Sequence, residues 1–250
     1  MKAYMNWSGG KDSSLALYHV LQTGVPDVDL LFTNVNAVHN RISMHGVRRE
    51  LLQAQAAAIG LPLVTAELPE QPSMADYETE MAASVARLKE RGYTTAVFGD
   101  IFLEDLKKYR EEQLAKVGVN CIFPIWKKHT KELMQEFLDV GFKAIIVCTN
   151  GAYLNESFCG RLIDESFVND LPDNIDVCGE NGEYHSFVFD GPIFKRPVPF
   201  KKAKQYSGNT VHPRRMRIFV PAVSKRLWVF IFATFYRFNY AATSVGTYHS

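Results

Sequence analysis

Residues 3–13 read Ala-Tyr-Met-Asn-Trp-Ser-Gly-Gly-Lys-Asp-Ser, and this stretch decides the fold. The apolar run at residues 3–7 predicts a buried strand. Behind it, residues 13–22 repeat apolar side chains at the spacing of one helical face. A polar turn with two glycines therefore joins a strand to a helix, which is the first unit of a parallel α/β sheet.

The same alternation continues along the first two thirds of the chain. Further strands are predicted at residues 28–35, 63–68, 93–98, 119–123 and 142–148, and further helices at residues 47–58, 77–92, 104–116 and 131–140. Residues 150–190 are rich in Gly, Asn, Asp and Glu and lack this regularity, so we expect a loop-built region laid over the sheet. The pattern predicts a doubly wound parallel α/β sheet with a smaller, loop-rich C-terminal α/β region.

Composition places the chain among soluble globular proteins. It has 250 residues, 47% of them hydrophobic, and no apolar run long enough to span a bilayer. The N-terminus does not resemble a secretory signal, so we expect a cytoplasmic protein that is not bound to a membrane. Four cysteines lie far apart without a C-x-x-C pair, which predicts reduced thiols rather than disulfides or a zinc clip.

Charge is divided unevenly along the chain. Eleven of the 28 Lys and Arg residues follow Asp190, the last acidic residue, which leaves 17 bases against 27 acids before it, a net charge of −10. An acidic body of this kind is a poor general binder of nucleic acids. Phosphate groups must therefore be bound by local features.

The turn Ser8-Gly9-Gly10-Lys11-Asp12-Ser13 is such a local feature. Its backbone N–H groups and the positive end of the following helix converge, its glycines permit close approach, and its lysine and serines supply a cation and hydroxyl donors for phosphate. The spacing is neither that of a P-loop nor that of a dinucleotide-binding fingerprint. The alternative is a tight turn with a solvated lysine.

Another candidate lies where the strand at residues 93–98 ends. Gly99 and Asp100 follow this strand at the edge where open α/β sheets bind ligands. Because Mg²⁺ prefers one or two carboxylates together with phosphate oxygens, Asp100 and Asp12 are candidate Mg²⁺ ligands. The alternative for Asp100 is to cap the next helix.

The hexapeptide at residues 8–13 resembles the pyrophosphate loop of the adenine nucleotide alpha hydrolase superfamily, the N-type ATP pyrophosphatases. Within it, Met44-His45-Gly46-Val47-Arg48, Gly99-Asp100-Ile101, Cys178-Gly179-Glu180-Asn181-Gly182-Glu183-Tyr184-His185 and Asp190-Gly191-Pro192 resemble the diphthine ammonia ligase family. The resemblance extends from Met1 to about Lys202. It implies a Rossmann-like fold of the HUP type with a PP-loop. It also implies the amidation of a carboxylate on a modified histidine of translation elongation factor 2, with ATP and ammonium.

The resemblance also suggests roles for single residues. Ser8, Gly9, Gly10, Lys11, Asp12, Ser13 and Gly99 are expected to bind ATP, with Asp12 and Asp100 on Mg²⁺. Lys11 is also expected to act in catalysis, by stabilising the charge of the departing pyrophosphate. His45 is expected near the adenylate, to contact the α-phosphate or the acceptor carboxylate. Glu180, Glu183 and His185 are expected to bind ammonium and accept its proton, unless they form a solvated acidic loop. Cys178 has no suitably spaced partner and is interpreted as structural.

These expectations combine into an ATP-dependent, adenylate-forming amide ligase. Residues 1–125 are expected to form the ATP-binding unit, residues 126–202 the substrate-binding region and residues 203–250 an atypical basic and aromatic tail. Two alternatives stay open. One is a tRNA-modifying adenylase, disfavoured by the acidic body, and the other is a nucleotide-binding module without turnover.

The tail contains an aromatic, apolar segment at residues 227–240, which is interrupted by Arg237. A membrane-surface helix, a dimer interface and a core segment are all compatible with it. The resemblance fades there and no acidic residue follows Asp190, and a frameshifted or otherwise non-native C-terminus explains both features. No catalytic role is expected for this tail.

Overall fold

A computed structural model describes residues 1–42, 47–200, 205–207 and 216–219. The N-terminal part alternates strands and helices in the order β1 (Lys2–Asn6), α1 (Lys11–Thr23), β2 (Asp27–Asn36), β3 (Arg41–Ile42), α2 (Arg49–Ile59), β4 (Leu63–Leu68), α3 (Met74–Glu90), β5 (Thr95–Val97), α4 (Glu104–Ala115) and β6 (Asn120–Ile122). Apart from the short β3, each of these elements coincides within a few residues with one predicted from periodicity.

The main sheet has the topology of a doubly wound fold. Strands β4, β2, β1, β5 and β6 pair side by side in this order and run parallel, and β3 adds an antiparallel pairing to the end of β2. The chain winds outward from β1 in one direction to β4, then returns to β5 and winds in the other direction to β6. The point where the winding reverses, between β1 and β5, is where such sheets bind ligands.

Two hydrophobic clusters cover opposite faces of this sheet. One combines apolar residues of α1 and α2, such as Leu17 and Leu52, with Met5 of β1. The other combines Leu88 of α3 with Tyr4 of the same strand. Successive residues of a strand point to opposite faces, so β1 is buried on both sides. This two-sided burial confirms the predicted doubly wound α/β class.

The C-terminal part forms a sheet of its own, which the sequence pattern did not reveal. Its elements are α5 (Thr130–Asp139), β7 (Lys143–Asn150), the 3-10 helix η1 (Glu156–Phe158), α6 (Glu165–Asn169), β8 (Tyr184–Asp190), β9 (Gln205–Ser207) and β10 (Met216–Phe219). The strands pair antiparallel in the order β8-β7-β10-β9. The predicted strand at residues 142–148 therefore exists as β7 but does not extend the parallel sheet. The region predicted to be loop-built ends in β8.

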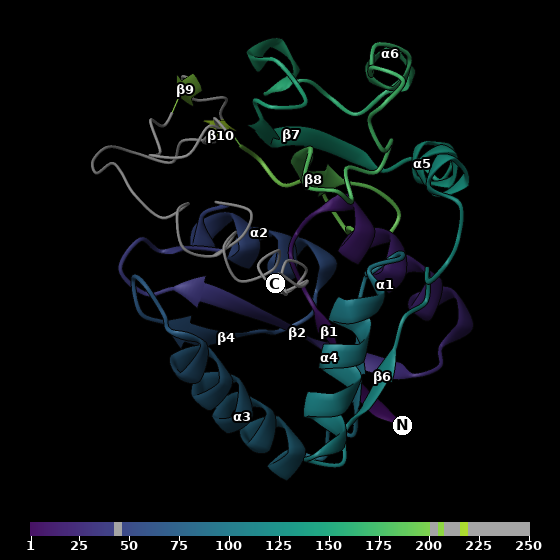
Figure 1. The fold of residues 1–250 in the computed structure, drawn as a ribbon. Coiled ribbons are helices and arrows are strands. Elements are labelled where there is room, and N and C mark those ends of the chain that lie inside the picture. The colour runs from purple at the N-terminus through teal and green to yellow at the C-terminus, as the bar shows by residue number, and fades with distance from the viewer. Residues whose placement is uncertain (43–46, 201–204, 208–215, 220–250) are drawn as a thin grey trace, which may run out of the picture.

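The second sheet lies against the carboxyl ends of the parallel strands. In Figure 1, β1 runs from the N-terminus towards β7 and β8, so the C-terminal part covers the edge where β1 ends. The backbone N–H of Val188 in β8 donates to the carbonyl of Gly9, at 2.9 Å. The turn after β1 is therefore enclosed between the two parts of the chain.

Two further findings concern the whole described chain. No helix within it is long and apolar enough to cross a membrane. All four cysteines are free, as predicted, and three of them are buried. His45, Gly46 and the aromatic segment at residues 227–240 lie outside the described residues.

Candidate nucleotide-binding site

The turn after β1 takes the shape that its two glycines permit. Gly9 has a φ of +75°, a region that residues with a Cβ atom rarely adopt, and a Cβ there would lie 2.5 Å from Oε1 of Gln55. Gly10 is the N-cap of α1, and its carbonyl accepts hydrogen bonds from the hydroxyls of Ser13 at 3.0 Å and Ser14 at 2.9 Å. The hydroxyls of Ser8 and Ser13 lie 3.0 Å apart. The turn is thus closed on itself at the positive end of α1.

Side chains far away in sequence hold this turn in place. Nε2 of Gln55, a buried residue of α2, donates to the carbonyls of Gly9 at 2.9 Å and Val188 at 2.6 Å, and its Oε1 accepts from Nε1 of Trp7 at 3.1 Å. The hydroxyl of Ser186 in β8 accepts from the backbone N–H of Lys11 at 3.1 Å. Sequence analysis did not single out Gln55 or Ser186, because nothing in the local spacing links them to the turn.

Lys11 is buried rather than solvated. Only 4% of the residue is exposed, its Nζ donates to Oδ1 of Asp12 at 2.6 Å, and it lies over the ring of Tyr184 at 5.6 Å from the centroid. Burial alone lowers the pKa of this amine, but Asp12 raises it, followed by Cys178 and Tyr184, and the net pKa lies well above its ordinary value. Lys11 therefore carries a fixed positive charge beneath the turn, and the alternative of a solvated lysine is wrong.

A small polar pocket of about 150 Å³ opens beside the turn, at the reversal point of the sheet. It is lined by residues from β1 and the turn, from the end of β5, from α4 and from the C-terminal part: Asn6, Ser8, Asp12, Ser13, Phe98, Gly99, Asp100, Arg110 and Glu180. Gly99 lets the segment after β5 approach the first turn of α1, because a Cβ there would lie 2.8 Å from the backbone C of Asp12 and N of Ser13. Of the candidate site residues, the structure thus brings Ser8, Asp12, Ser13, Gly99, Asp100 and Glu180 to one pocket, whereas Gly9, Gly10 and Lys11 do not line it.

Three carboxyl groups share this pocket. Burial, together with the neighbouring Asp12 and Asp100, raises the pKa of Glu180 to about 8 against the opposing effect of Lys11. Burial also raises the pKa of Asp100 and of Asp12, with Arg110 and Lys11 acting in the opposite direction. Glu180 therefore tends to hold its proton near pH 7, and a cation bound beside these carboxyl groups would favour its ionised form.

These donors fit Mg²⁺ only together with a bound phosphate. Among the described residues, no three His, Cys, Asp or Glu side chains are clustered closely enough to hold a metal ion alone. Mg²⁺ does not require such a cage, since one or two carboxylates plus phosphate oxygens suffice. Asp12, Asp100 and Glu180 face one pocket and supply hard oxygen ligands, so the chemistry of the donor set is suitable.

Asp100 does not cap the next helix. The N-cap of α4 is Leu103, and the carboxylate of Asp100 is instead paired with Arg110 of the same helix. Nη2 of Arg110 donates to Oδ1 of Asp100 at 3.2 Å, and its Cζ lies 4.3 Å from the ring centroid of Phe98. Arg110 is a pocket residue that sequence analysis missed, because it looked like one charge among many on an exposed helix.

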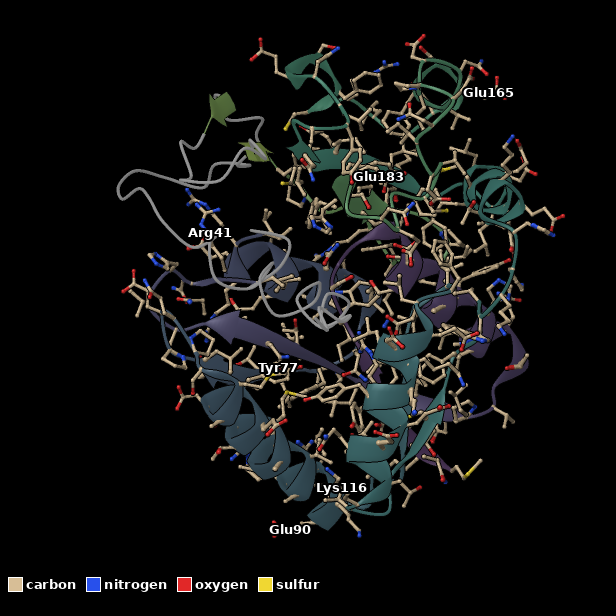
Figure 2. All side chains as sticks on the ribbon, viewed as in Figure 1. Arg41, Tyr77, Glu90, Lys116, Glu165 and Glu183 are labelled. Carbon is tan, nitrogen blue, oxygen red and sulfur yellow. The ribbon has the colours of Figure 1, made fainter. Side chains whose placement is uncertain are left out.

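Glu183 and His185 lie near the pocket but do not line it. Glu183 is 2% exposed, and its carboxylate accepts hydrogen bonds from the backbone N–H groups of Asp176 at 3.2 Å and Asn181 at 2.9 Å. Figure 2 shows it beside β8, in the upper part of the molecule. This geometry supports a role in shaping the loop before β8 rather than the expected contact with ammonium.

His185 belongs to β8 rather than to a loop, and burial lowers its pKa to about 4. The imidazole is therefore neutral near pH 7 but only a weak base, which does not favour the expected acceptance of a proton from ammonium. Burial raises the pKa of Cys178 far above its ordinary value, and its thiol donates to the carbonyl of Thr130 at 3.3 Å. An unreactive, hydrogen-bonded thiol agrees with the structural interpretation of Cys178.

Comparisons with known proteins match both parts of the chain. The family model for the diphthamide synthase N-terminal domain matches residues 1–121, and the model for the diphthamide synthase C-terminal domain matches residues 129–212.

Curated relatives match over the same region. The diphthine–ammonia ligase of Danio rerio is 24% identical over 211 residues, which cover 76% of this chain and 83% of the relative. The Bos taurus ligase is also 24% identical, over 214 residues that cover 76% of this chain and 79% of the relative. The Schizosaccharomyces pombe ligase is 26% identical over 209 residues, which cover 76% of this chain and 34% of that longer protein. The chain therefore belongs to the diphthine–ammonia ligase family, whose members form a carbon–nitrogen bond.

Proposed function

We propose that this protein is an ATP-dependent amide ligase that activates a carboxylate as its adenylate and then amidates it. In the first step an oxygen of the acceptor carboxylate attacks the α-phosphorus of ATP, the bond to the β-phosphate oxygen breaks, and pyrophosphate leaves. In the second step ammonia attacks the acyl carbon, and AMP departs with the carboxylate oxygen. The acceptor is proposed to be diphthine, the substrate in the names of the relatives. Its location on elongation factor 2 is proposed from the resemblance described in the sequence analysis.

The observation that carries this proposal is the pocket at the reversal point of the sheet. It joins a closed turn at the positive end of α1 to three carboxyl groups, with the buried charge of Lys11 beneath. A helix N-terminus and a fixed cation stabilise the negative charge of a departing pyrophosphate. The turn at residues 8–13 and Gly99 are therefore proposed to bind ATP.

The three carboxyl groups of the pocket are proposed to have different roles. Asp12 and Asp100 would hold Mg²⁺, which supplies charge neutralisation and orientation of the phosphates when bound. Glu180, with its pKa raised to about 8, is suited to accept the proton that ammonium must lose before it attacks. Glu183 and His185 are proposed to position this loop. His45 is retained as a candidate contact to the α-phosphate or the acceptor.

The proposed units follow the two parts of the fold. Residues 1–125 would bind ATP, and residues 126–202 would bind the acceptor, with Glu180 reaching from the second unit into the pocket of the first. A reducing, cytoplasmic setting is supported by four cysteines that remain free thiols.

The test is a reaction with all substrates, followed by their omission one at a time. Purified protein, ATP, Mg²⁺, ammonium chloride and elongation factor 2 carrying diphthine should release AMP and pyrophosphate together with amidated acceptor. Omission of ammonium should stop amide formation. The formation of ADP and inorganic phosphate would contradict adenylation, and binding of ATP without any product would favour a nucleotide-binding module.

A further inference from the structure

The pocket contains acidic groups, although its proposed ligand, ATP, is itself negatively charged. ATP carries several negative charges, whereas the pocket contributes three carboxyl groups, and the amine of Lys11 is already paired with Asp12. Lys11 is not among the residues that line the pocket. Within the described part of the chain, Arg110 is the one lysine or arginine that lines it.

Arg110 lies where its guanidinium can leave Asp100 and pair with another anion. Its guanidinium lies over the ring of Phe98, a pocket residue, and its side chain remains 28% exposed, whereas that of Asp100 is only 13% exposed. This contact with the ring restricts the position of the guanidinium, whose N–H groups can still donate to oxygen acceptors. Arg110 therefore combines a defined orientation with access to the pocket.

The pair between Arg110 and Asp100 is incomplete. Nη2 makes a hydrogen bond to Oδ1, but Nε and Oδ2, at 3.2 Å from each other, do not satisfy hydrogen-bond geometry, and both atoms are buried. A buried polar atom without a hydrogen bond is unfavourable, and a ligand that supplies a partner for it gains affinity. The unsatisfied pair adjoins the space proposed for the phosphates.

We propose that Arg110 binds the polyphosphate of ATP, and that nucleotide binding exchanges its ion pair with Asp100 for one with a phosphate. Asp100 is then released towards the cation that accompanies the nucleotide. This inference rests on the proposed ATP site and adds a residue to it. Arginine suits the task because its planar fork can donate two parallel hydrogen bonds to a phosphate.

The test measures binding of ATP and of adenosine by calorimetry, without turnover, for the wild type and three variants. Arg110→Met removes the charge but keeps an apolar chain on Phe98, and Arg110→Lys keeps the charge without the fork. Lys108→Met is the matched control, since its side chain is 76% exposed on the same helix and absent from the pocket. Thermal unfolding checks that each variant is folded.

Arg110→Met is expected to weaken ATP binding by about tenfold or more, since a charge-assisted bidentate pair is lost, and to leave adenosine binding unchanged. Arg110→Lys should restore part of the ATP affinity, and Lys108→Met should have no effect. Equal ATP affinity of Arg110→Met and wild type, or an equal loss for ATP and adenosine, would overturn this inference alone. Absence of ATP binding by the wild type would overturn the proposed function as well.

ATP binding by Asp100→Asn tests the exchange of partners independently. With EDTA present, this variant should bind ATP more tightly than the wild type, because the carboxylate that competes for Arg110 has lost its charge. With Mg²⁺ present, the gain should shrink or reverse, because the metal has lost a ligand. Weaker binding under both conditions would contradict the exchange.

Discussion

The pocket predicts an unusual dependence of stability on pH that centres on Glu180. The pKa of this carboxyl group is raised from 4.5 to about 8, first by burial and then by Asp12. Because the folded pKa lies above the unfolded one, the folded state holds the proton more tightly. The stability that this group contributes is therefore fully present below about pH 4.5 and is lost as the pH rises through about 8. Glu180→Gln, which stays neutral at every pH, should avoid this loss.

The size of the effect follows from the shift. A change from 4.5 to about 8 corresponds at most to ~5 kcal/mol, at ~1.36 kcal/mol per unit of pKa. Glu180 titrates together with Asp12, which relaxes part of the repulsion, so we expect about 2 kcal/mol at pH 9. For a chain of this size this corresponds to a rise of roughly 4–8 °C in the unfolding midpoint of the variant relative to the wild type.

The assay is thermal unfolding at pH 5, 7 and 9 of the wild type, Glu180→Gln and Glu90→Gln. Glu90 is exposed at the end of α3 and serves as a matched control for the loss of one carboxylate. The midpoint of Glu180→Gln minus that of the wild type should be small at pH 5 and should increase towards pH 9, while the control difference stays flat. A constant difference for Glu180→Gln, or one that decreases with pH, would refute the reasoning.

Three further substitutions probe the groups around the turn. Lys11→Ala should abolish ATP cleavage, because the positive charge beneath the turn is lost. It should also lower the unfolding midpoint by roughly 4–12 °C, because a partly buried ion pair of about 2–3 kcal/mol with Asp12 is broken. Unchanged pyrophosphate release would remove Lys11 from the ATP site. Glu183→Gln should destabilise the protein by about 1–3 kcal/mol in urea unfolding, because the amide NH₂ of glutamine would face one of the two backbone N–H groups that donate to the carboxylate. Unaltered stability with lost amide formation would restore the catalytic role. Ser186→Ala should weaken ATP binding by about fivefold, because the N–H of Lys11 loses its acceptor; equal affinity in calorimetry would show that the turn holds its shape without β8.

Local pattern was sufficient for most of the N-terminal fold. Helices α1 to α3 have apolar residues at helical spacing and a polar or glycine boundary, whereas the charged helix α4 has opposite charges four residues apart. All these signals lie within one segment. The turn at residues 8–13 was also recognisable, since its glycines and serines act through their own backbone. The Mg²⁺ candidates Asp12 and Asp100 both face the pocket, because parallel strands end at a common edge.

Other features depend on contacts across the chain. The sequence analysis placed β8 in a loop, because the segment before it is rich in polar residues. The burial of every second residue of β8, Tyr184, Ser186 and Val188, is apparent only in the structure. Gln55 and Ser186 hold the turn from 46 and 175 residues away, and no spacing rule connects them. Arg110 resembles its exposed neighbours on α4 until the tertiary structure places it against Phe98 and Asp100. The burial of Lys11 has the same origin, since Tyr184 covers it from the second sheet.

The central claim is that the acceptor carboxylate attacks the α-phosphorus of ATP in this pocket. The most direct measurement labels the acceptor carboxylate with heavy oxygen and follows the label by mass spectrometry after turnover with ATP, Mg²⁺ and ammonium. Adenylation predicts one labelled oxygen in the phosphate of AMP for each amide formed, and unlabelled pyrophosphate. Label in inorganic phosphate, or amide formation with unlabelled AMP, would contradict the account.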